Sequence, residues 1–157
     1  MVIIIGAFIP LSSIHEDKLW LLFIKLGVLI LGIALYLILH ELTHGIVMKL
    51  FGTKKIKYGF TGDFAYAGSD DYYAKTPYII IALAPVILWG IVLLLLCFTV
   101  PYNWLWIVCL IQTINIYGAG GDFYVTFKFL RLPKDILVRD FGTSMTVYSK
   151  NVKKDLD

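Results

Sequence analysis

Three apolar stretches dominate the sequence and limit what the chain can fold into. They cover residues 19–50, 77–100 and 104–121. In the first stretch, Lys25 is the only charged residue before His40. A run of about 18 or more apolar residues with few charges indicates a helix that crosses a lipid bilayer. The chain is therefore expected to be an all-α membrane protein with three transmembrane helices.

The composition supports this interpretation. Hydrophobic residues make up 59% of the chain, charged residues make up 16%, and the mean hydropathy is +0.81. Soluble domains average about 45–50% apolar and about 25% charged residues. The net charge of +3 is modest, and the basic residues gather in one loop and in the tail. We therefore expect contact with the lipid bilayer and no nucleic-acid partner.

The loop at residues 52–76 predicts a small amount of β structure. It is rich in glycine and aromatic residues, and apolar and polar residues alternate along it. This pattern predicts a β-hairpin in which residues 56–60 pair with residues 64–67. No internal repeat divides the chain, so we expect one membrane domain over residues 1–157.

The two ends of the chain carry weaker signals. In the tail, residues 123–157, the pattern predicts a helix end, a break at Pro133, a short helix or turn, and a strand near residues 143–148. At the start, residues 1–18 include too few apolar residues to cross a bilayer. We expect an interfacial or partly inserted segment there.

The lysine and arginine residues predict the orientation of the chain in the membrane. They flank the loop at residues 52–76 and crowd the tail, whereas the turn at residues 101–103 has none. Basic residues concentrate on the cytoplasmic side of membrane proteins. We therefore expect a multi-pass protein of the cell membrane, with a cytoplasmic hairpin loop, a short cytoplasmic tail and the N-terminus outside.

Two histidines and a glutamate lie inside the first apolar stretch, in the sequence LYLILHELTHGIVMKL. His40 and His44 are four residues apart and therefore share one face of a helix. Two imidazoles at this spacing can bind one zinc ion, and Glu41 beside them can act as a general base. The alternative is a helix end whose histidines only form hydrogen bonds. The chain has just three histidines, and two at this spacing inside an apolar stretch favour the metal site.

A zinc site of this kind needs a third protein ligand. Asp122 follows the third apolar stretch in the sequence NIYGAGGD, at a depth comparable to that of the two histidines, and zinc readily accepts a carboxylate oxygen. Asn115 lies seven residues earlier, on the same helical face. The alternative for Asp122 is that it caps a span in water. Asp63 and His15 are rival ligands, although His15 lies on the opposite side in the predicted orientation.

Together these features resemble the site-2 protease class of intramembrane zinc metalloproteases. Members have a His-Glu-x-x-His motif in one span, a hairpin loop, a span with proline, and a span that ends in Asn and Asp. The segment GGDFYVTFKFLRLPKDILVRD is similar to the zincin peptidase family of small bacterial membrane proteins, which is related to that class. The similarity runs from residue 40 to about residue 148. It implies zinc as cofactor, with ligands His40, His44 and Asp122, catalytic base Glu41 and substrate-binding residue Asn115.

The resemblance predicts an intramembrane zinc endopeptidase. Its partners would be membrane-embedded or membrane-associated proteins or peptides, cleaved near the cytoplasmic face, and an edge strand of the hairpin could hold an extended substrate. The alternative from another class is a non-catalytic membrane interaction protein with a structural metal or polar cluster. A di-iron oxidase would need more than three histidines. The substrate, the native metal and a homo-oligomeric state stay open.

Overall fold

The computed structural model describes residues 18–62 and 64–149. The expected interfacial segment before Lys18 and the rival ligands His15 and Asp63 lie outside the described residues. The order of the elements is α3 (Leu19–Leu50), β1 (Ile56–Phe60), β2 (Ala65–Ser69), β3 (Tyr72–Ala74), α4 (Lys75–Cys97), the 3-10 helix η1 (Tyr102–Trp104), α5 (Leu105–Gly118), α6 (Gly120–Leu130), β4 (Ile136–Asp140) and β5 (Met145–Ser149).

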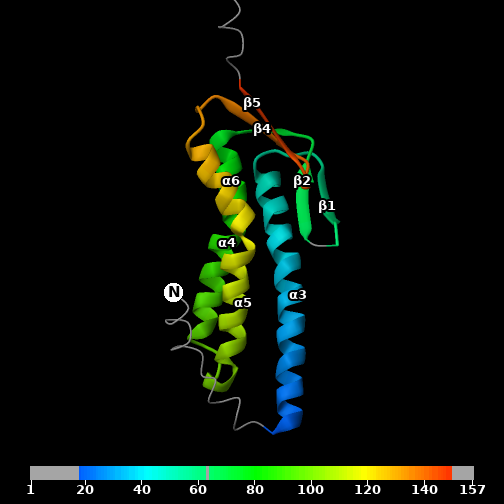
Figure 1. Cartoon of the computed structure of the whole chain (residues 1–157), viewed down its shortest axis with the longest axis vertical. Coiled ribbons are helices and arrows are strands. Elements are labelled where there is room, and N and C mark those ends of the chain that lie inside the picture. The colour runs from blue at the N-terminus through cyan, green and yellow to red at the C-terminus, as the bar shows by residue number, and fades with distance from the viewer. Residues whose placement is uncertain (1–17, 63, 150–157) are drawn as a thin grey trace, which may run out of the picture.

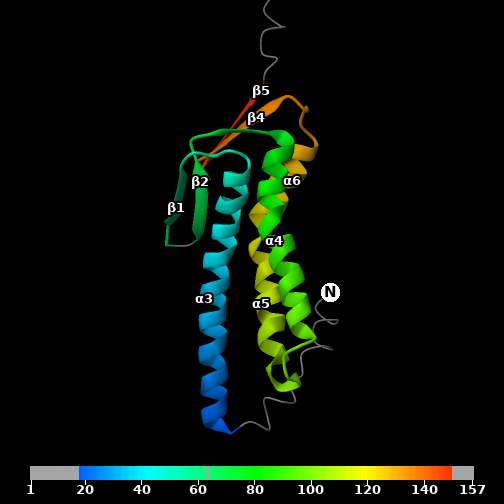
Figure 2. The same ribbon diagram turned by 180° about the vertical axis from the view of Figure 1, so that it is seen from behind.

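Three helical segments of the described chain are long and apolar enough to cross a membrane, as predicted. They are Leu19–Leu50, Lys75–Cys97 and Tyr102–Leu130. Helices α3, α4 and α5 lie side by side along the long axis of the molecule (Figure 1), and the view from behind shows the same arrangement (Figure 2). The β-strands all gather at one end of this helical bundle.

The third segment continues past residue 121, where the predicted span ends. The chain interrupts its helix at Ala119 and resumes as α6 to Leu130. Glycine weakens a helix by about 1 kcal/mol relative to alanine, and three glycines lie around this interruption. Thr126 and Phe129 of α6 are nevertheless buried. Tertiary packing therefore carries the helix past its weak point.

Strands β1 and β2 form the predicted antiparallel hairpin. Tyr58 stands opposite Ala67, and Phe60 stands opposite Ala65. Gly62 in the turn has a φ of +100°, a conformation that L side chains rarely adopt. The hairpin lies against the C-terminal part of α3, on the side away from α4 (Figure 1).

A second sheet, with the strand order β3-β4-β5, was not predicted as such. The turn expected after Pro133 lies at residues 134–135, and the strand expected near residues 143–148 is β5, but strand β4 between them was not predicted. Ile136 and Val138 alternate with less buried neighbours, as a strand with one buried face requires. Strand β4 pairs with β3 on one side and with β5 on the other, and these pairings satisfy its backbone groups.

The two sheets touch through glycine. A Cβ on Gly68 of β2 would collide with the backbone of Phe141 and Gly142 in the turn between β4 and β5. This close approach joins the hairpin to the sheet of β3, β4 and β5, which we call the C-terminal sheet. Both sheets therefore lie near the C-terminal end of α3.

The buried side chains form two clusters, one on each side of the histidines along α3. The cluster near the sheets includes Met48, Ile81, Phe129 and Val138. The cluster among the spans includes Tyr36, Trp106 and Ile111. The segment from His40 to His44 therefore lies between two packed regions, which restrict its movement.

Lys25 lies near the start of α3, where a lysine side chain can often extend to the water layer. It is fully buried, and its Nζ lies 5.6 Å from the centroid of the Trp104 ring. The segment that joins α4 to α5 folds against the start of α3 and meets the lysine there. A cation over an indole ring is a favourable arrangement.

Candidate metal centre

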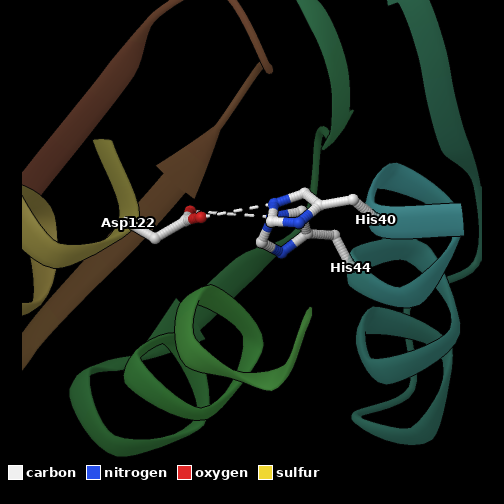
Figure 3. Close-up of side chains that lie close together, drawn as sticks. All are labelled: His40, His44 and Asp122. Carbon is white, nitrogen blue, oxygen red and sulfur yellow. Dashed lines mark ion pairs between the residues drawn. The ribbon is translucent and has the colours of Figure 1, made fainter. Parts of the chain in front are cut away.

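His40, His44 and Asp122 converge between α3 and α6. The Nε2 atom of His40 lies 3.5 Å from Oδ2 of Asp122, and the Nε2 atom of His44 lies 3.6 Å from Oδ1. One ligand atom from each residue lies within 4.8 Å of the others. Figure 3 shows the carboxylate pointing from its helix towards both imidazoles. Asp122 is in the first turn of α6, where a helix favours a negative charge.

A buried chain of hydrogen bonds sets the tautomer of His40. The Nδ2 group of Asn115 donates to the carbonyl oxygen of Val86 at 3.2 Å, so its Oδ1 is the acceptor for the hydroxyl of Tyr36 at 2.9 Å. The single hydroxyl proton of Tyr36 is thereby used. Tyr36 must then accept from Nδ1 of His40, which lies 2.9 Å away. The proton of neutral His40 is therefore on Nδ1, and the lone pair of Nε2 points to Asp122.

His44 has the same tautomer for a simpler reason. Its Nδ1 atom lies 2.9 Å from the carbonyl oxygen of Ile81 in α4, and a carbonyl oxygen can only accept. Nδ1 must carry the proton, and Nε2 carries the lone pair. Trp89 of the same helix donates to Thr43 at 3.0 Å, which holds α4 against the motif. Helix α4 thus orients the imidazole of His44, and α5 orients that of His40 through Asn115 and Tyr36.

This donor set fits a zinc ion. When both histidines are neutral, with the tautomers that these hydrogen bonds favour, their Nε2 lone pairs face carboxylate oxygens, which are also electron-pair donors. Three such donors with no proton between them repel one another unless a cation joins them. Two imidazole nitrogens and one carboxylate oxygen are the protein ligands of many catalytic zinc sites, which keep one further position open. The outer hydrogen bonds from Tyr36 and Ile81 are of the kind that orients metal-binding histidines.

Glu41 faces two cavities that meet at the motif. The first, which we call the membrane-side groove, has a volume of about 710 Å³ and runs along α3 beneath the hairpin. Its wall contains apolar residues of the candidate span α3, such as Leu37 and Ile38, and residues of the hairpin region, Phe60 and Phe64. An extended apolar chain segment could lie in this groove with its backbone next to Glu41.

The second cavity, which we call the polar chamber, has a volume of about 470 Å³ and lies below the C-terminal sheet. It is lined by Asp122, Asp140 and turn residues 142–144, and among the residues that the structure describes no lysine or arginine lines it. The residues shared by the groove and the chamber are His40, Glu41, Phe64, Ala65, Tyr66 and Gly118. The motif therefore lies where the apolar membrane-side groove meets the polar chamber.

Gly45, directly after the motif, allows the hairpin to pack against α3. A Cβ at this position would overlap the hydroxyl group of Tyr58 in β1. Tyr58 lines the membrane-side groove together with Glu41. Burial and the Glu41 carboxylate both raise the pKa of Tyr58. Tyr58 therefore stays a neutral hydrogen-bond donor beside the motif.

Asp140 is an acidic residue of the site that sequence reasoning missed. One carboxylate oxygen accepts a hydrogen bond from the hydroxyl of Tyr78, and the other accepts from the backbone N–H of Gly142 at 2.7 Å. Burial raises the pKa of Asp140, although these two hydrogen bonds act in the opposite direction. No sequence signal connects the end of β4 to the motif, because only the tertiary fold brings them to one chamber.

The predicted site residues differ in their surroundings. His40, Glu41, His44 and Asp122 all border the polar chamber. Asn115 is fully buried, lines neither cavity, and uses its amide group on Tyr36 and Val86. These contacts support the imidazole of His40 through Tyr36. Tyr36 was missed, although its position one helical turn before His40 placed it on the same face.

Comparison with protein families agrees with the geometry. The profile of one family, described as "Putative zincin peptidase", matches residues 33–137. This range includes the motif, the hairpin and Asp122, and covers more than half of the chain. Neither the curated proteins nor the solved structures gave a match. Zincins are zinc peptidases, so membership suggests a metallopeptidase with zinc as its metal. The chain belongs to this family of zincin peptidases.

Proposed function

We propose that the chain is an intramembrane zinc endopeptidase of the site-2 protease type. The observation that carries this proposal is the convergence of His40, His44 and Asp122 at the junction of an apolar groove and a polar chamber, with Glu41 beside them. A structural metal site would need neither a base at this place nor an open route to it.

The residues present divide the chemistry among them. His40, His44 and Asp122 would hold zinc, which when bound supplies a Lewis acid that activates water and polarises a carbonyl group. Glu41 accepts a proton from the attacking water and passes it to the departing amine of the substrate. Tyr36 and Asn115 keep the lone pair of His40 directed at the site, and we assign Asn115 this positioning role.

Access for a peptide would come from the membrane side. A helical substrate hides its carbonyl groups in its own hydrogen bonds, so the cleaved segment must be extended. In the membrane-side groove such a segment lies along the hairpin, where addition of a β-strand could hold its backbone. Water and the polar part of the substrate would use the chamber under the C-terminal sheet, where Asp140 is located.

The orientation follows from the basic residues. The end of the molecule that carries the sheets also carries the basic loop and tail, so it would face the cytoplasm, with the N-terminus outside. The site would then cleave membrane substrates near the cytoplasmic face.

The test compares Glu41→Gln with Asp122→Ala in the full-length chain purified in detergent. Glu41→Gln should keep about one zinc per chain, whereas Asp122→Ala should lose it or bind it much more weakly. In membranes of cells producing each protein, mass spectrometry should find new peptide termini near membrane spans only with the wild type. Zinc in all three proteins with identical termini in every membrane would refute a peptidase and favour the non-catalytic membrane protein.

A further inference from the structure

A third groove lies on the outer side of α3, across strand β1 from the metal centre. Its volume is about 760 Å³, and it is formed by the last two turns of α3 and the chain that leads into β1. Tyr58 lines both this groove and the membrane-side groove. We call the third groove the basic groove. It shares no residue with the proposed zinc ligands.

The floor of the basic groove is apolar and open. Leu42, Ile46 and Leu50 follow one another at four-residue spacing, so they form one stripe along α3. They are 42%, 53% and 79% exposed. On a helix that crosses a membrane, such a stripe contacts hydrocarbon chains.

The rim of the groove is positively charged. Lys49, Lys54 and Lys55 line it and are exposed. Within residues 18–62 and 64–149, none of these three ammonium groups forms an ion pair with an acid, whereas Lys57 nearby is paired with Asp70 at 2.6 Å. Three exposed positive charges without an ion pair among the described residues therefore lie at the end of an apolar stripe.

We propose that the basic groove binds one anionic phospholipid. The phosphate would lie among Lys49, Lys54 and Lys55, and an acyl chain would follow Leu42, Ile46 and Leu50 into the bilayer. Charge complementarity selects an anionic headgroup over a zwitterionic one. The apolar stripe selects a lipid over soluble phosphate, which could use the lysines alone. The proposal does not depend on peptidase activity, because it uses neither the proposed zinc ligands nor Glu41. Leu42 lies within the motif and also lines the membrane-side groove, but it takes no part in the proposed chemistry.

The test uses the full-length chain in a neutral detergent. Native mass spectrometry would measure retention of phosphatidylglycerol and of phosphatidylcholine with the same acyl chains. The variant is Lys49→Gln/Lys54→Gln/Lys55→Gln. The matched control, with an equal loss of charge at the end of α6 and beyond, is Lys128→Gln/Arg131→Gln/Lys134→Gln. Zinc content would check that each protein is folded.

We expect one phosphatidylglycerol per wild-type chain, retained far better than phosphatidylcholine. Each lysine near an anionic headgroup is worth roughly a factor of five in binding, so the triple variant should bind on the order of 100-fold more weakly. The control should bind as the wild type does, and glycerol phosphate should not compete. Equal retention of both lipids, equal loss in the control, unchanged binding in the triple variant, or competition by glycerol phosphate would each overturn the proposal.

Discussion

Removing one hydroxyl group, by Tyr36→Phe, tests how the metal centre is held. This hydroxyl donates to Asn115 and accepts from Nδ1 of His40, at 2.9 Å in both cases. His40 is 8% exposed and Asn115 is not exposed, so water cannot replace the missing partner. Phenylalanine keeps the ring and its packing. The substitution therefore isolates the hydrogen bonds from the shape of the core.

Two effects of known size follow. An unmade hydrogen bond in a buried place costs about 1–3 kcal/mol, so the variant should unfold more easily by that order. Loss of an outer hydrogen bond to a metal-binding histidine weakens metal binding about 10- to 100-fold. That weakening corresponds to about 1.4–2.8 kcal/mol of binding free energy. Zinc affinity should fall because the imidazole of His40 can then rotate or change its tautomer.

The assay is competition for zinc between the detergent-purified chain and a chromophoric chelator of known affinity. Tyr102→Phe is a matched control, because it removes the same group from a side chain that is 67% exposed and far from the site. The control should bind zinc as the wild type does. Wild-type zinc affinity in a folded Tyr36→Phe protein would refute the proposed role of this hydrogen-bond chain.

Three further predictions concern packing and charge around the site. Gly45→Ala should push Tyr58 and its hairpin away from α3, and limited proteolysis should then cut the hairpin faster than in the wild type. Burial raises the pKa of Asp140, so the native state holds this proton more tightly than the unfolded chain does. The contribution of Asp140 to stability therefore falls as pH rises from the unfolded value of about 4 through the raised native pKa. Denaturant unfolding of the metal-free protein should show this decrease, and Asp140→Asn should reduce it. Phe129→Ala, at a side chain that is 1% exposed, should lower the unfolding free energy by about 3–5 kcal/mol, and Phe127→Ala, at an exposed neighbour, by less than about 0.5 kcal/mol in the same experiment.

Local patterns were sufficient for much of the fold. The long apolar stretches predicted the three candidate spans, and alternation with a glycine turn predicted the hairpin of β1 and β2. The same rules missed β4, because a strand of five residues after a proline is stabilised by its partners β3 and β5. They also did not show that α6 packs into the core, where contacts of Phe129 hold the helix beyond the glycine region.

For the metal centre too, part of the arrangement follows from the sequence and part only from the tertiary structure. The sequence by itself determined that His40 and His44 share one face of an apolar helix with Glu41 beside them, because helical geometry depends only on spacing. It also determined a short set of candidates for the third ligand. Only the tertiary structure decided that Asp122 faces both imidazoles, that Asn115 supports Tyr36 from behind, and that Asp140 enters the chamber. These contacts join α3, α5, α6 and β4, and their distances depend on how the elements pack, which no local rule contains.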